Sequence, residues 1–180
     1  MSPSTARAVS MALLGGITAP LFLAGGLLEW AAFIGWAVLL AAGGDTPALK
    51  KTIPGFVVGA FLAWLAMMIR NQVDVSAAVW LWMPRAGIAA AVALLVLGLA
   101  AKVDALSYLP AGLVGFACVF GALTFPSSVA LDLQSTGPSL GERLTALHMY
   151  NPFIQASLSL VGGAIVGLLS ARLARALSKE

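Results

Sequence analysis

The stretch VSMALLGGITAPLFLAGGLLEWAAFIGWAVLLAAGG, residues 9–44, decides the fold of this chain, because it is nearly all apolar. As one α-helix it would be about 54 Å long at 1.5 Å per residue, whereas the hydrocarbon core of a bilayer is about 30 Å thick. The chain must therefore turn back within it. We expect the turn at Gly25 and Gly26, because two glycines loosen a helix end, with Trp30 at the membrane interface.

The whole chain has the composition of an integral membrane protein. Of its 180 residues, 61% are hydrophobic and only 9% are charged, whereas soluble domains carry roughly 25% charged residues. No segment is polar enough to cover a separate soluble domain, so residues 1–180 are expected to form a single membrane domain. The basic residues lie in short groups beside the apolar stretches, which is typical of topology signals and gives no reason to expect nucleic-acid binding.

Six apolar stretches of near-spanning length predict an all-α, polytopic membrane protein with six transmembrane helices. The expected spans are residues 9–28, 30–44, 53–69, 86–101, 105–125 and 153–171. Most lysines and arginines then fall on the side of the two termini, so the positive-inside rule predicts that both termini are cytoplasmic. The polar loop 126–150 and Glu29 would face the other side. Glu29 would sit at the tip of a helical hairpin, within reach of water, where an ionised carboxylate is tolerated.

The two halves of the chain share a pattern. AAFIGWAVLLAA around Gly35 aligns with AGLVGFACVFGA around Gly115, so that Trp36 falls on Phe116. Each stretch is followed by a span with glycines four residues apart, which lets helices approach closely. Units of three spans insert in opposite orientations, so a true repeat, with halves of about 8–70 and 86–172, would be an inverted 3+3 repeat. The alternative is that any two Ala/Gly-rich spans align this well.

Two segments resemble a known family. LLEWAAFIGWAVLLAAGG, residues 27–44, and LSYLPAGLVGFACVFGAL, residues 106–123, are similar to the small bacterial inner-membrane proteins catalogued as domain of unknown function 1097. The resemblance covers about residues 10–175 and rests on glycines, alanines and aromatics. It implies a compact polytopic protein of the bacterial inner membrane with no established activity. This chain departs from that family in its longer polar loop, residues 126–150.

A shorter resemblance points to a solute. TFPSSVAL, residues 124–131, and HMYNPF, residues 148–153, are similar to stretches in the second half of urea transporters, a family with inverted repeats that typically forms trimers. The present chain is much shorter than the members of that family. The resemblance implies a channel-like path for a small neutral amide.

Residues for enzymatic chemistry are missing from the sequence. It has one histidine, one cysteine, no HExxH, no phosphate-binding loop and no Cys/His cluster, so we expect neither an enzyme nor a metal site or cofactor. Ionisable groups at membrane depth are equally scarce. Only Glu29 and Arg85 come near, both at an edge, so a transported solute is expected to be neutral rather than charged.

Seven residues are candidates for lining a pore or binding a solute, and each has a structural alternative. Gln155 and Ser159 share one helix face, where they either line a path or hydrogen-bond a neighbouring helix. Trp36 and Phe116 either form an aromatic constriction or pack in the core. Glu29 either orients a solute's N–H groups at the mouth or marks the interface. The full set is Glu29, Trp36, Phe116, Thr124, Asn151, Gln155 and Ser159.

These observations predict a channel or facilitator for a small neutral polar molecule of the urea or short-amide type. Its expected partners are the lipid bilayer, the solute and further copies of the chain, since Gly and Ala faces favour helix packing between copies. Two other functions stay open. One is a non-transporting accessory or scaffold subunit, and the other is a proton-coupled transporter that uses Glu29.

Overall fold

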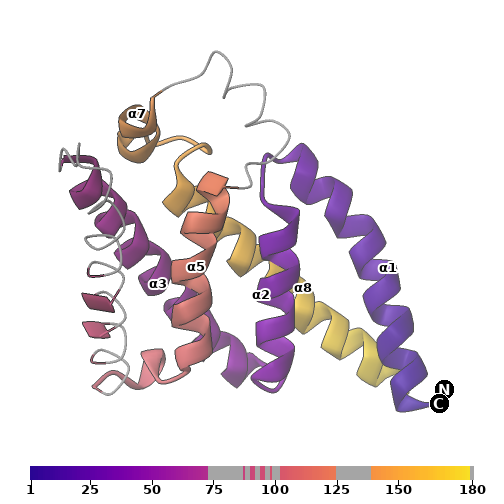
Figure 1. Cartoon of the computed structure of the whole chain (residues 1–180). Helices are drawn as coiled ribbons and strands as arrows, with labels where there is room; N and C mark the ends of the chain where they lie inside the picture. The colour runs from indigo at the N-terminus through magenta and orange to yellow at the C-terminus, as the bar shows by residue number, and fades with distance from the viewer. Residues whose placement is uncertain are drawn as a thin grey trace.

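A computed structural model describes residues 1–72, 102–124 and 139–178, together with Gly87, Ala90, Ala91, Leu94, Leu95 and Gly98. The regular elements in this part of the chain are helical (Figure 1). They are α1 (Pro3–Ala24), α2 (Glu29–Ala41), α3 (Thr46–Gln72), the 3-10 helix η1 (Asp104–Leu106), α5 (Leu109–Thr124), α7 (Leu140–Thr145) and α8 (Pro152–Leu177). The predicted all-α fold class is confirmed.

Three helices are long and apolar enough to cross a membrane: α1 with 22 residues, α3 with 27 and α8 with 26. Helices α2 and α5 are apolar but shorter, with 13 and 16 residues. The second span, expected over residues 30–44, is therefore short for a bilayer, because 13 residues reach only about 20 Å. The predicted fourth span, 86–101, lies outside the described residues except for the single positions named above, so the count of six spans stays a prediction.

Several observed helix boundaries differ from the predicted ones: α1 begins at Pro3 rather than residue 9, α8 ends at Leu177 rather than residue 171, and the starts of α5 and α3 also differ. The fifth span was expected to begin at residue 105, but α5 begins at Leu109, because the chain first forms η1. Pro110 stands in the first turn of α5, where its missing N–H leaves no hydrogen bond unmade. The third span begins earlier than expected, at Thr46, where the Asp45 carboxylate accepts a 2.8 Å hydrogen bond from the N–H of Ala48. That is the usual N-terminal cap of a helix.

The turn predicted between the first two spans is confirmed. Helix α1 ends at Ala24, and Gly26 adopts φ 71°, in the left-handed region that favours glycine. The N–H of Leu27 donates to the carbonyl of Phe22 at 2.9 Å, which closes the helix end in a Schellman-type turn. Helix α2 begins at Glu29, so this carboxylate lies at a helix N-terminus, where the helix dipole favours negative charge.

Helix α2 packs along α8 through backbone contacts at glycines. A Cβ added at Gly35 would collide with the carbonyl oxygen of Leu160, and one added at Gly163 would collide with the carbonyl oxygen of Ala32. The two helices run in the same direction. Gln155, in the first turn of α8, bonds to the carbonyl of Gly26, which precedes α2, and Arg175 near the end of α8 bonds to the carbonyl of Gly44, just after α2.

The pair of α3 and α5 repeats this arrangement. A Cβ at Gly115 would collide with the carbonyl oxygen of Phe56, and one at Gly59 would collide with the carbonyl oxygen of Gly112. In both pairs each helix supplies one glycine and one carbonyl, with the carbonyl three residues before the glycine. In Figure 1, α2 and α5 lie side by side in front, while α3 and α8 cross behind them.

Helix α1 lies on the outside of the bundle. Only Ala6 and Ser10 of its residues are buried, and its exposed positions include Leu13, Ile17 and Leu21. An apolar helix with an exposed apolar face fits contact with lipid rather than water. Both chain ends lie at one end of the bundle, and α7 lies at the opposite end (Figure 1).

Candidate functional site

Glu29 and Trp36 lie on one face of α2, seven residues apart, which is two helical turns. Both line a narrow crevice between α1, α2 and α8, which as it stands has no room for a water molecule. The other lining residues are Thr18, Phe22, Ala32, Phe33, Gly163 and Val166. We name this space the Glu29 crevice, and the packing of α1, α2 and α8 around it the three-helix interface.

Two residues that line the crevice each have a polar atom without a hydrogen-bond partner among the described residues. They are the Oε2 atom of Glu29 and the Nε1 atom of Trp36, both buried. Leaving a buried polar group unpaired costs about 1–3 kcal/mol. The carboxylate oxygen accepts hydrogen bonds, and the indole N–H donates one. The sequence predicted that Glu29 lies within reach of water. In the structure the residue is half-buried, and its Oε2 atom is fully buried.

An aromatic pair closes the three-helix interface beside the crevice. The rings of Phe33 and Trp36 stack with centroids 6.0 Å apart and planes inclined by 14°. Gly15 of α1 faces both rings, since a Cβ there would lie 3.6 Å from Phe33 and 3.9 Å from Trp36. Gly167 of α8 faces Trp36, because its Cβ would come within 2.8 Å of the indole. Trp36 therefore fills the space between α1 and α8.

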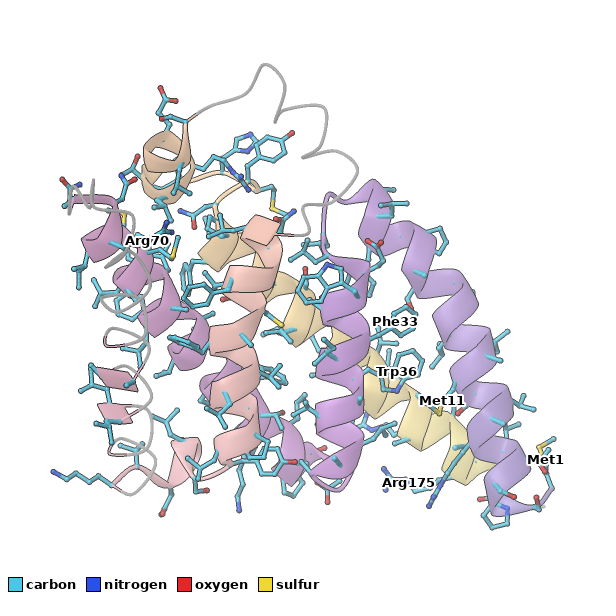
Figure 2. The ribbon with its side chains drawn as sticks, in the orientation of Figure 1. Met1, Met11, Phe33, Trp36, Arg70 and Arg175 are labelled. Atoms are coloured by element: carbon cyan, nitrogen blue, oxygen red, sulfur yellow. The ribbon has the colours of Figure 1, made fainter. Side chains whose placement is uncertain are left out.

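A larger cavity of about 360 Å³ lies beyond the aromatic pair, at the end of the bundle that holds both termini. Its walls belong to the same three helices and to the turn after α2, and its lining includes Arg7, Ser10, Met11, Leu40, Gly44, Ser170 and Arg175. We name it the terminal cavity. Figure 2 shows Phe33, Trp36, Met11 and Arg175 following one another along this interface. The crevice, the ring pair and the cavity thus succeed one another along α1, α2 and α8.

Gln155 and Ser159 share one face of α8, as predicted, and both bond to the turn before α2. The Nε2 atom of Gln155 donates to the carbonyl of Gly26 at 2.7 Å. The Ser159 hydroxyl accepts from the N–H of Leu28 at 2.9 Å and donates to the carbonyl of Gln155 at 2.7 Å. These bonds hold the turn that leads into Glu29. They agree with the interhelical alternative.

Asn151 is buried and serves as the N-terminal cap of α8. Its Oδ1 atom accepts from the N–H of Phe153 at 3.0 Å, while its Nδ2 atom donates to the carbonyls of Leu144 and Ala146, each at 3.0 Å. The side chain thus ties α7 to the start of α8. Thr124 is the last residue of α5, and residues 125–138 after it lie outside the described part, as does most of the segment 124–131 that resembles urea transporters.

Phe116 lies in a different helix interface from Trp36. Its ring packs against Phe120, with centroids 5.1 Å apart, and against Leu62 and Ala66 of α3. The described structure therefore does not bring Trp36 and Phe116 together into one constriction. The ring beside Trp36 belongs to Phe33, which sequence reasoning missed. Its signal was the three-residue spacing, since such residues are neighbours on a helix surface.

The family model for proteins of unknown function named DUF1097 matches residues 8–175, from the first turns of α1 to the last turns of α8. The chain belongs to this family. No curated protein and no solved structure matches it. The resemblance noted in the sequence is thereby confirmed for DUF1097, whereas no comparison supports similarity to urea transporters.

Membership in DUF1097 carries no assigned activity, so function has to be argued from the three-helix interface. Among the described residues, no group of three His, Cys, Asp or Glu side chains could hold a metal ion.

Proposed function

We propose that this DUF1097 protein is a channel or facilitator that passes a small neutral polar molecule along the three-helix interface. One observation carries the proposal. The Glu29 crevice and the terminal cavity lie in line between the same three helices, and the rings of Phe33 and Trp36 line the crevice on the side of the cavity. A cavity that continues into a crevice too narrow for water, with aromatic rings at the narrow point, is the arrangement expected of a gated path in its closed state.

The barrier is one that a small movement of α1 would open. A Cβ added at Gly15 would meet the two rings at ordinary van der Waals distance, and α1 buries only Ala6 and Ser10. A flat aromatic constriction admits small planar molecules and excludes hydrated ions, which cannot shed their water there. Phe33 is 46% exposed and closes the path on the outer side of the bundle.

The polar groups along the path favour a neutral solute. The residues around the crevice hold an unpaired acceptor, Oε2 of Glu29, and an unpaired donor, Nε1 of Trp36. If the crevice opened, these groups would suit a molecule such as urea or a short amide that carries both N–H and C=O groups. The arginines of the terminal cavity, Arg7 and Arg175, would repel cations at the other end. Gln155 and Ser159 act as positioning residues, because they hold the turn before Glu29.

We also propose that the chain is an inverted 3+3 repeat. A pseudo-two-fold axis that relates α2 to α5 would carry Gly35 and its contact with Leu160 onto Gly115 and its contact with Phe56. It would equally carry Gly163 onto Gly59. The short turn between α2 and α3 reverses the chain, and α3 runs parallel to α5 (Figure 1), so α2 and α5 point in opposite directions. Trp36 then corresponds to Phe116.

The location proposed is the bacterial inner membrane, with both termini in the cytoplasm. Its support is that both termini lie at one end of the bundle and that Arg7, Arg172 and Arg175 lie near them in the chain, which fits the positive-inside rule. The homo-oligomer stays a prediction. The glycines that suggested it, among them Gly59 and Gly163, make their close contacts within the chain.

Flux through proteoliposomes tests the proposed path. Trp36→Ala removes the larger ring, so we expect urea flux to rise several-fold. We also expect glycerol, which is bulkier than urea, to be excluded less well than in wild type. Phe61→Ala serves as the control, because this ring packs with Trp64 and Phe153 and lines neither hollow. The inverted repeat predicts that Phe116→Ala also alters flux. Equal flux in wild type, Trp36→Ala and empty vesicles would instead favour an accessory or scaffold subunit.

A further inference from the structure

The terminal cavity holds two arginines that have no acidic partner. Arg7 of α1 and Arg175 of α8 both line it, and neither pairs with a carboxylate among the residues that the structure describes. Asp45 follows Gly44 of the cavity wall, but it does not line the cavity, and its carboxylate accepts a 2.8 Å hydrogen bond from the N–H of Ala48. The described lining thus holds two arginines and no carboxylate, so it carries positive charge.

The guanidinium of Arg175 is fixed in place. Its Nε atom donates to the carbonyl of Ala171 at 3.1 Å, and its Nη2 atom donates to the carbonyl of Gly44 at 3.0 Å. An arginine has five N–H donors, so three remain for a ligand. Arg7 lies on the opposite wall, where no hydrogen bond of its side chain ties it to another described residue. Its charge is available to the same ligand.

The remaining lining of the cavity is polar at its base and apolar beside it. Ser10 and Ser170 are buried and lie 3.1 Å apart between their hydroxyl oxygens. Met11 and Leu40 supply apolar surface. Next to the cavity, α1 exposes an apolar face that includes Val9 and Leu13. Charged donors, hydroxyls and an adjoining apolar face thus occur together at a helix-bundle end (Figure 2).

We propose that the terminal cavity binds a phosphate group between Arg7 and Arg175. Arginine forks match phosphate oxygens, and basic pockets between transmembrane helices at this level bind the headgroups of anionic lipids. A phosphodiester of an anionic phospholipid and free inorganic phosphate share this chemistry. The exposed apolar face beside the cavity favours the lipid, whose acyl chains would lie along it. The phosphate site occupies the terminal cavity, which is also one end of the proposed solute path, but it is defined by its charge and is tested without measuring flux.

The test uses the full chain in mild detergent, with dioleoylphosphatidylglycerol, dioleoylphosphatidylcholine and inorganic phosphate as probes, and native mass spectrometry as the readout. We expect saturable binding of one phosphatidylglycerol per chain, weakened at least about fivefold in Arg7→Gln, a change that breaks no side-chain hydrogen bond among the described residues. Arg175→Lys keeps the charge but loses the fork, and should weaken binding too. Lys51→Gln removes an exposed charge that does not line the cavity and should leave binding unchanged.

Competition identifies the source of the phosphate. If millimolar inorganic phosphate leaves phosphatidylglycerol bound, the ligand is the lipid headgroup. If inorganic phosphate displaces the lipid from wild type and not from Arg7→Gln, the site binds soluble phosphate. Both results support the proposal. Two results would overturn it. One is that phosphatidylcholine and phosphatidylglycerol bind with equal affinity and inorganic phosphate does not bind. The other is that Arg7→Gln and Lys51→Gln weaken phosphatidylglycerol binding equally.

Discussion

Gly35 of α2 lies so close to the backbone of Leu160 in α8 that a side chain at position 35 would collide with its carbonyl. Gly115 of α5 stands in the same relation to Phe56 of α3. Contacts of this kind bring helix backbones within reach of Cα–H···O interactions, each worth about 0.5–1 kcal/mol. In a bilayer, where apolar association gains little, close packing of this kind holds helices together.

Gly35→Ala is therefore expected to destabilise the fold. The added methyl group forces α2 and α8 apart, and overpacking of this kind costs about 1–3 kcal/mol. Gly16→Ala is the matched control, because a Cβ at Gly16 meets nothing within 4 Å; alanine there should be neutral or stabilise by about 0.5–1 kcal/mol. Thermal unfolding in detergent measures both. Equal melting temperatures for the two variants would contradict the contact.

Ser159→Ala should destabilise the turn that leads into Glu29. It removes the acceptor for the buried N–H of Leu28, and an orphaned buried donor costs about 1–3 kcal/mol. Ser157→Ala offers the comparison, since the hydroxyl of Ser157 is buried without a partner among the described residues and its removal should be neutral. Hydrogen exchange at residues 25–30 gives the readout. Unchanged protection in Ser159→Ala would show that the turn does not depend on this bond.

Glu29→Gln separates a facilitator from a proton-coupled transporter. The amide keeps the size and hydrogen-bonding capacity of the side chain but cannot carry a proton across. A facilitator predicts a modest fall in flux with no change in its pH dependence. The measurement is uptake with and without an imposed pH gradient. Gradient-driven accumulation in wild type that disappears in Glu29→Gln would replace the channel proposal with the coupled one.

The orientation of the chain is tested by cysteine labelling. Leu147 is 95% exposed and lies beside α7, at the end of the bundle opposite the termini (Figure 1). In a background with Cys118 replaced, Leu147→Cys in spheroplasts should react with a membrane-impermeant maleimide, and Ser178→Cys should react only after lysis. The reverse pattern would place the termini outside.

Much of the fold could be predicted from short stretches of sequence, because it depends on local properties. The length of the apolar run and the pair Gly25–Gly26 predicted the first hairpin, which the structure confirms. The four-residue spacing of Gln155 and Ser159 placed them on one face, although it did not reveal that the Gly26 carbonyl and the Leu28 N–H are their partners. Spacing defines a helix face and leaves open what that face touches.

The terminal cavity could not have been predicted in this way. It is formed by Arg7 and Arg175, which lie near opposite ends of the chain and meet only because α1 and α8 pack together through Ser10 and Ser170. Nothing local in either segment indicates that meeting. The predicted start of α5, at residue 105, lies within η1. The change from a 3-10 helix to an α-helix leaves no mark in the hydropathy of the sequence.

The most direct test of the solute path blocks it from α1. Gly15 faces the rings of Phe33 and Trp36, whereas the neighbouring Gly16 faces open space on the outside of the bundle. Gly15→Leu should therefore fill the gap beside the rings and reduce urea flux into proteoliposomes at least about fivefold, while Gly16→Leu, which adds the same side chain toward lipid, should retain wild-type flux. Equal flux through the two variants, at equal amounts of folded protein, would contradict a path along α1, α2 and α8.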